Sequence, residues 1–264
     1  MKLDYGTQLS PEPITLSVGT IRKPTLRDIA KITFARFGYY EFLLKLNPEL
    51  YYTNMKGNDG KEYWETLTAE EQEAIELYAL IESEEELQKQ FVMVFNFFFI
   101  ENVVFQEGYF IILKNTVESF EEITDISSIR GVISKDTFQQ VIGILQQICC
   151  IYDDEEMPSE SEFKNKLAQK MFEKMLQAKK KQNKKKRVDK NLTLPNIISS
   201  VSSKHNSLNI INIWDLTVFQ LLDSFNRISN DCAYDISALR VAVWGDEKKT
   251  FDSSLWHKNN YDKK

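Results

Sequence analysis

The chain has 264 residues and a formal net charge of −6, with two histidines, three cysteines, nine glycines and six prolines. Glycine and proline reach about half of their average combined usage, so long helices are favoured over frequent turns. So few histidines exclude His-rich metal sites and leave little room for a His-based catalytic triad. The three cysteines form no paired disulfide framework, which favours a reducing compartment.

The N-terminal residues favour an extended arm over positions 1–24. This stretch carries three prolines around the alternating, partly β-branched run 14–21, a composition that suits a short strand or an extended arm that reaches a partner's surface. The first residues lack the apolar stretch of a secretory signal. The longest apolar run, 91–100, is too short to span a bilayer. We therefore expect a cytoplasmic protein without membrane association.

Residues 25–150 are expected to form a helical domain, whose helix starts are marked by capping boxes. A Ser or Thr followed three residues later by an acidic residue occurs at Thr25, Thr68 and Ser83, and such pairs satisfy free N–H groups at a helix N-terminus. We expect Gly38 to interrupt the first of these helices. The following segment ends at Asn47-Pro48, and 51–60 is expected to be a polar loop.

The same domain should contain one β hairpin between two strongly apolar helices. The helix after Ser83 carries an apolar stripe through Phe98, and this stripe must be covered. Strand-like runs at 103–105 and 109–113 are separated by Gln-Glu-Gly, in which Gly108 can adopt the positive φ of a tight turn. Ser134 is expected to start another apolar helix that ends near Cys149 and Cys150. We interpret these cysteines as small apolar core residues.

A reversal of charge marks residues 151–191 as a connector. Six acidic residues lie between 153 and 162, and the stretch 164–190 then holds twelve basic residues against two acidic ones. That stretch has a local net charge of +10, which leaves −16 for the rest of the chain. Its apolar positions recur every four residues, so a lysine-rich helix with one apolar ridge is predicted. The ridge comprises Phe163, Leu167, Met171 and Met175.

Residues 192–264 are expected to form a helical C-terminal domain. Pro195 favours the first turn of a short helix, and Asn212 can cap a longer helix that includes Trp214. The large side chains of the tail, among them Trp256, are expected to pack rather than dangle. The predicted fold class is therefore mainly α with a minor β hairpin, built as two helical domains joined by a charged helical connector.

No linear motif for catalysis, cofactor binding or metal binding is present. The glycines form neither a dinucleotide-binding nor a nucleotide-triphosphate loop, and the acidic clusters at 70–73 and 84–86 coincide with expected helix starts. We therefore expect no enzyme, no cofactor and no metal, although a carboxylate site needs no linear motif, so an enzyme stays open as a third class. Basic side chains could instead contact phosphates of a nucleic acid, solvate a helix end or bind a protein. These residues are Lys179, Lys180, Lys181, Lys184, Lys185, Lys186 and Arg187.

Two C-terminal sequences carry a resemblance to a known group of proteins. The run IWDLTVFQLLDSFNR at 213–227, followed by LWHKN at 255–259, resembles small tail-morphogenesis proteins of bacteriophages that infect low-GC Gram-positive bacteria. Within this group the chain is similar to tail assembly chaperone-like proteins over about residues 192–264. The resemblance implies a non-enzymatic protein of the host cytoplasm or the virion. Its partners would be other tail proteins, including the tape-measure protein that such chaperones hold soluble.

That role requires apolar surfaces for a helical client. We expect the ridge to supply one, with Trp214 and Trp256 as further anchors. A nucleic-acid-binding accessory protein that uses the lysine-rich segment is the alternative.

Overall fold

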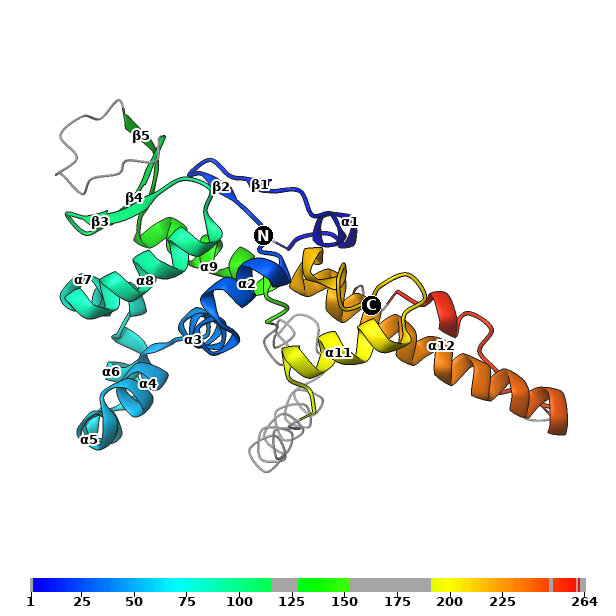
Figure 1. The fold of residues 1–264 in the computed structure, drawn as a ribbon. Helices are drawn as coiled ribbons and strands as arrows, with labels where there is room; N and C mark the ends of the chain where they lie inside the picture. The colour runs from blue at the N-terminus through cyan, green and yellow to red at the C-terminus, as the bar shows by residue number, and fades with distance from the viewer. Residues whose placement is uncertain (1, 115–127, 152–190, 247–248, 260, 262–264) are drawn as a thin grey trace.

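The computed structural model describes residues 2–114, 128–151, 191–246, 249–259 and 261. This part of the chain is mostly helical with two small antiparallel sheets, as predicted (Figure 1). None of its helices is both long enough and apolar enough to cross a membrane. Up to residue 98 the elements are α1 (Tyr5–Leu9), β1 (Ile14–Thr15), β2 (Thr20–Ile21), α2 (Leu26–Ile32), α3 (Phe34–Leu44), α4 (Pro48–Leu50), the π-helical turn η1 (Tyr51–Met55), α5 (Gly57–Thr66), α6 (Ala69–Ala74), α7 (Leu77–Ser83) and α8 (Glu85–Phe98). They are followed by β3 (Val103–Gln106), β4 (Tyr109–Leu113), β5 (Ile129–Ile133), α9 (Lys135–Ile148), α11 (Leu194–Lys204), the 3-10 turn η4 (Ile213–Asp215), α12 (Val218–Trp244) and the 3-10 turn η5 (Leu255–His257).

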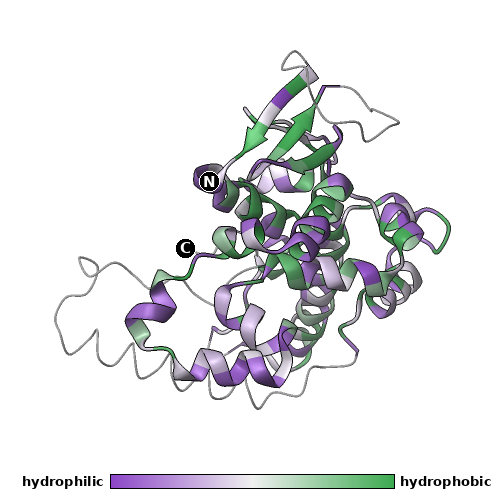
Figure 2. Cartoon of the chain, turned by 90° about the vertical axis from the view of Figure 1, so that its left-hand side faces the viewer, coloured by the Kyte–Doolittle hydropathy of each residue, from purple (hydrophilic) through white to green (hydrophobic). Residues whose placement is uncertain are grey.

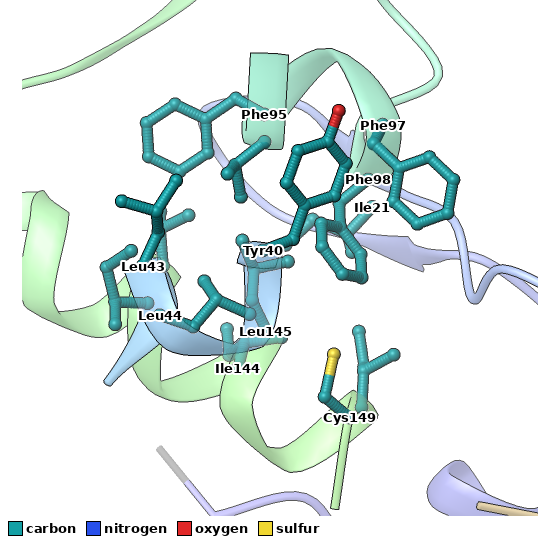
Figure 3. Packing of buried hydrophobic residues seen from close by; sticks show 14 of the residues in the cluster. Ile21, Tyr40, Leu43, Leu44, Phe95, Phe97, Phe98, Ile144, Leu145 and Cys149 are labelled. Carbon is teal, nitrogen blue, oxygen red and sulfur yellow. The ribbon is translucent and has the colours of Figure 1, made fainter. Parts of the chain in front are cut away.

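The core is centred on α8, whose apolar stripe is buried as the sequence predicts. The ring of Phe95 lies 4.8 Å from that of Phe110 on β4, and the ring of Phe91 lies 5.5 Å from that of Phe138 on α9. Burying each such side chain contributes about 1.5–3 kcal/mol. Figure 2 shows hydrophobic segments both in the central helices and in the strands of the sheet. In Figure 3 the side chains that meet from α3, α8 and α9 include Leu43, Leu44, Phe95, Phe98, Ile144 and Leu145.

The predicted hairpin is confirmed and belongs to a three-stranded sheet. Strands β3 and β4 pair antiparallel, and β5, which the sequence analysis did not predict, pairs with the other edge of β4. Glu107 and Gly108 both have positive φ, 51° and 82°. Two consecutive positive φ values match the right-handed twist of the flanking strands, which is why a glycine is favoured in this turn.

Two of the three predicted capping boxes are present at the starts of helices. The capping boxes predicted at Thr25 and Thr68 are present. The box predicted at Ser83 is absent, because the Ser83 hydroxyl donates to the carbonyl oxygen of Leu80 at 3.0 Å and α8 begins after Glu84 instead. Ser83 therefore ends α7 and does not start α8, because only Glu84 separates the two helices.

Two predicted interruptions are also wrong. Helix α3 runs through Gly38, and the break lies at Thr33, which has a φ of 76° and accepts a hydrogen bond from the Arg36 N–H. The predicted loop 51–60 is helical. Its ring contacts explain this difference, because Tyr52 lies 5.6 Å from the stacked ring of Trp64 in α5. Packing of this kind overrides weak local helix propensity.

Residues 2–24 contain α1 and the β1–β2 pair and pack on the chain itself, so the run 14–21 forms short strands and not an extended arm. The Tyr5 hydroxyl donates to the Asp223 carboxylate of α12 at 3.1 Å and accepts from Arg227 at 2.7 Å. The Tyr261 hydroxyl donates to the carbonyl oxygen of Leu3 at 2.6 Å. Both ends of the described chain therefore meet at the first half of α12 (Figure 1).

The C-terminal elements share the core of the N-terminal ones. The Leu26 N–H donates to the carbonyl oxygen of Leu216 at 2.8 Å, and Thr25 and Thr217 form an isolated β-bridge. The division into residues 1–24, 25–150, 151–191 and 192–264 stays a prediction, but apolar residues on both sides of 151–191 belong to one cluster. Its C-terminal members are Ile197, Ile198, Val201, Ile213, Val218 and Leu221.

Candidate protein-contact surfaces

Most of the predicted contact residues lie outside the described residues. This applies to the ridge residues Phe163, Leu167, Met171 and Met175, and to the basic residues Lys179, Lys180, Lys181, Lys184, Lys185, Lys186 and Arg187. Their proposed roles stay predictions. The structure locates the two predicted anchors, Trp214 and Trp256, on separate elements.

The sequence predicts Trp214 on the long helix. In the structure it lies in the 3-10 turn η4 before that helix. Its indole N–H donates to the carbonyl oxygen of Ile210 at 2.8 Å, and its ring is half-buried. The ring lines a shallow hollow together with α2, whose Arg27 forms an ion pair of 2.8 Å with Asp215. Both charges are largely exposed, so this pair positions the turn but stabilises it by no more than about 1 kcal/mol.

The true start of α12 corrects a second expectation. Thr217, not Asn212, caps this helix, and the Gln220 side chain completes the capping box by accepting from the Thr217 N–H at 2.9 Å. The Asn212 side chain instead accepts a hydrogen bond from the Asn209 N–H at 2.7 Å and so stabilises the turn before the helix. The pattern Thr-x-x-Gln at 217–220 was visible in the sequence, but the expected helix already spanned it.

The turn before α12 presents two isoleucines to solvent. Ile210 and Ile211 are 57% and 79% exposed. Their backbone is fixed by polar side chains: the Asn209 side chain accepts from the Ile211 N–H at 2.8 Å, and the His205 ring accepts from the Leu208 N–H at 3.1 Å. Such side-chain-to-backbone bonds hold a turn without a hydrophobic core of its own. Sequence reasoning missed these residues, because no periodic pattern distinguishes them.

The tail packs in part, as expected. The ring of Phe251 lies 5.5 Å from that of Tyr234 on α12, and η5 lies against the same helix. Trp256 remains 53% exposed, with its ring 4.7 Å from that of His257. Trp244, which was expected to pack, is largely exposed at the end of α12.

The second half of α12 carries further exposed apolar side chains. Ile236, Leu239 and Val243 are 71%, 67% and 60% exposed, and their spacing of three and four residues places them on one face. Figure 1 shows this half of α12 projecting beyond the other labelled elements. We call these three residues the open stripe.

A groove of about 700 Å³ lies where α3 and α9 meet α11 and α12. Burial raises the pKa of the Glu41 carboxyl and, together with Glu41, raises the pKa of the fully buried Cys149 thiol. A raised thiol pKa disfavours the nucleophilic thiolate, so Cys149 fits the core-filling role predicted for it. In the described part of the chain, no group of three or more His, Cys, Asp or Glu residues is arranged to hold a metal ion.

Comparison with known proteins gives one finding. Residues 179–261 match the family model of the YomV second domain. The C-terminal third of the chain is similar to that domain, which points to a phage-associated family. The match contains α11, η4, α12 and η5, and it overlaps the stretch in which the sequence resembles phage proteins. Neither curated proteins nor solved structures gave a significant match.

Proposed function

We propose that the protein is a non-enzymatic tail-assembly protein of a bacteriophage, chaperone-like or virion-associated, that acts through protein contacts in the host cytoplasm. Its partners would be other tail proteins, including the tape-measure protein. Two findings support this proposal. The C-terminal third is similar to a phage-associated domain, and the same third exposes several large apolar side chains.

The observation that carries the proposal is the fixed turn with its two exposed isoleucines. Exposed apolar side chains mark surfaces that a partner can cover, and burying them in the complex favours binding. A backbone that is already fixed in the free protein loses less conformational entropy when the partner binds. Ile210, Ile211 and the half-buried ring of Trp214 lie within five residues of one another, and the Trp214 indole bonds to the Ile210 backbone. This turn can therefore serve as a small preorganised anchor for an apolar partner segment.

Co-expression with the tape-measure protein and the tail-tube protein of the same phage tests this function. We expect affinity-tagged protein to capture at least one of them, and we expect Ile210→Ser/Ile211→Ser to reduce capture about tenfold, as the loss of about 1.4 kcal/mol of binding energy would. Ile100→Ser is the matched control, because Ile100 is 53% exposed and lies outside the family match. Failure of the wild type to capture either protein, or equal capture by the double variant, would contradict the proposal.

The nucleic-acid alternative depends on the lysine-rich segment. Titration with duplex DNA at about 50 and about 200 mM salt distinguishes it, since phosphate contacts predict an affinity that falls steeply with salt. Replacing Lys179, Lys180 and Lys181 by Gln should then weaken binding. Absence of binding at the lower salt concentration excludes this alternative.

A further inference from the structure

The groove where α3 and α9 meet α11 and α12 is lined mainly by apolar side chains. Among its described lining residues, only Glu41 and Lys45 are charged. Leu192, which also lines it, is 59% exposed, and Phe34 and Leu222 are half-buried. The volume of about 700 Å³ falls in the range of clefts that enclose a ligand, about 300–1,000 Å³. The groove can therefore hold several apolar side chains of a further segment.

Residues 152–190 begin and end at this groove. Ile151, the last described residue before them, lines the groove, and so does Leu192, the second described residue after them. At about 3.3–3.6 Å per residue, an extended stretch 152–162 reaches up to about 40 Å. Phe163, the first residue of the ridge, can therefore return to the groove from Ile151.

One part of this stretch has the chemistry of the groove. Its beginning, 153–162, carries six acidic residues, and 179–190 consists mainly of lysines. Burying such charges without partners is costly, which excludes both parts from an apolar groove. The part between them is predicted to be helical with apolar positions on one side, two of which are methionines that adapt to an irregular surface. These positions are Phe163, Leu167, Met171 and Met175, with Phe172 and Leu176 beside them.

We propose that the ridge of the same chain occupies this groove, so that residues 163–176 pack against α3, α9, α11 and α12. A segment tethered at both ends of its site has an effective concentration of about 1 mM. A second copy or a tail protein at micromolar concentration therefore competes poorly for the groove. The ridge then joins the N-terminal elements to α11 and α12 and is not available to a client. This inference is independent of the proposed function, which depends on Ile210 and Ile211.

The reactivity of Cys150 tests whether the ridge covers the groove. Cys150 lines the groove and is half-buried, Cys149 is buried, and Cys232 is replaced by Ser. A thiol reacts in proportion to the time for which it is exposed, so Met171→Asp should raise the rate of modification by a soluble aromatic disulfide about tenfold. The matched control is Gln169→Asp, because Gln169 lies about 160° around the predicted helix from Met171 at 100° per residue.

This control should react like the parent chain, and all three chains should have the same circular dichroism spectrum. Equal rates in the three chains overturn the proposal. Protection that increases with protein concentration between about 1 and about 100 µM also overturns it, because the occupant would then be a second copy.

Disulfide formation tests the position of the ridge without weakening the contact. In the same background, Leu167→Cys, Met171→Cys and Met175→Cys each place a thiol on the ridge, and Gln169→Cys places one on the opposite face. A disulfide requires Cα atoms about 4.4–6.8 Å apart. On mild oxidation with oxidised glutathione, at least one ridge variant should form an intramolecular bond to Cys150 faster than the control. No ridge variant faster than the control, or mainly intermolecular bonds, would contradict the arrangement.

Discussion

Helix α8 and the second half of α12 have the same kind of apolar periodicity but opposite surroundings. In α8 the stripe that contains Phe91 and Phe95 is fully covered by α9 and by the sheet. In α12, Ile236 and Leu239 project from the molecule with neither α11 nor the tail on their side. The comparison teaches that periodicity determines where a helix forms, whereas the number of neighbouring elements determines whether its apolar face contributes to stability.

The largest effect should come from the aromatic centre of the core. Phe95→Ala removes a fully buried ring that packs against Phe110 and Phe138, and we expect it to lower the free energy of unfolding by about 3–5 kcal/mol. Trp244→Ala, which removes an exposed ring, should change it by less than about 0.5 kcal/mol. Urea denaturation followed by circular dichroism measures both. Similar losses for the two variants would contradict the comparison.

The two halves of α12 allow a sharper test with one residue type. Leu221 is fully buried and Leu239 is largely exposed on the same face of the same helix. Leu221→Ala should cost about 2–5 kcal/mol, and Leu239→Ala less than about 0.5 kcal/mol. A cost above about 2 kcal/mol for Leu239→Ala would show that the stripe is covered by the chain itself.

A smaller effect distinguishes the observed helix start from a predicted one that is absent. Thr217→Ala removes the capping box that begins α12, and we expect a loss of about 1 kcal/mol. Ser83→Ala should change little, because the Ser83 hydroxyl bonds only to the exposed end of α7. Thermal unfolding of the two variants beside the wild type is sufficient, and an equal loss would contradict the assignment of α12's cap.

The smallest effect concerns the groove where α3 and α9 meet α11 and α12. Burial raises the pKa of Glu41, with Lys45 opposing part of the shift, so the folded chain holds this proton more tightly than the unfolded chain does. Stability therefore falls as the pH rises through the folded-state pKa, and it recovers as the pH is lowered toward the ordinary value of 4.5. Glu41→Gln should raise the melting temperature by a few degrees at pH 7, and this gain should shrink at lower pH. A gain that is constant with pH would exclude the titration as its cause.

Local signals in the sequence predicted much of the fold where one signal dominated. Glu-Gly at 107–108 predicted the hairpin, and Thr25 and Thr68 predicted two helix starts. The predictions were wrong where contacts between distant side chains, and not the local sequence, determined the secondary structure. Tyr52 stacks on Trp64, and this packing keeps 51–60 helical. Helix α3 continues through Gly38 because buried side chains on both sides of this glycine, such as Phe37 and Tyr40, hold the helix against the core.

The contact surfaces were harder to predict for a different reason. The sequence predicts a long C-terminal helix, but the apolar periodicity that continues to Val243 does not show which part of this helix other elements cover. Likewise, Ile210 and Ile211 belong to a turn held by Asn209 and His205, and this arrangement has no simple spacing rule. Exposure depends on contacts between distant segments, which a single sequence does not specify.

The β-bridge between Thr25 and Thr217 joins the caps of α2 and α12 across most of the length of the chain. The portion similar to the YomV second domain therefore completes its own hydrophobic burial only with help from the N-terminal elements. Expressed alone, a fragment covering 179–261 would bring Val218 and Leu221 into contact with water and would be prone to aggregate. A useful truncation should instead keep α2 and remove residues from the far end of α12.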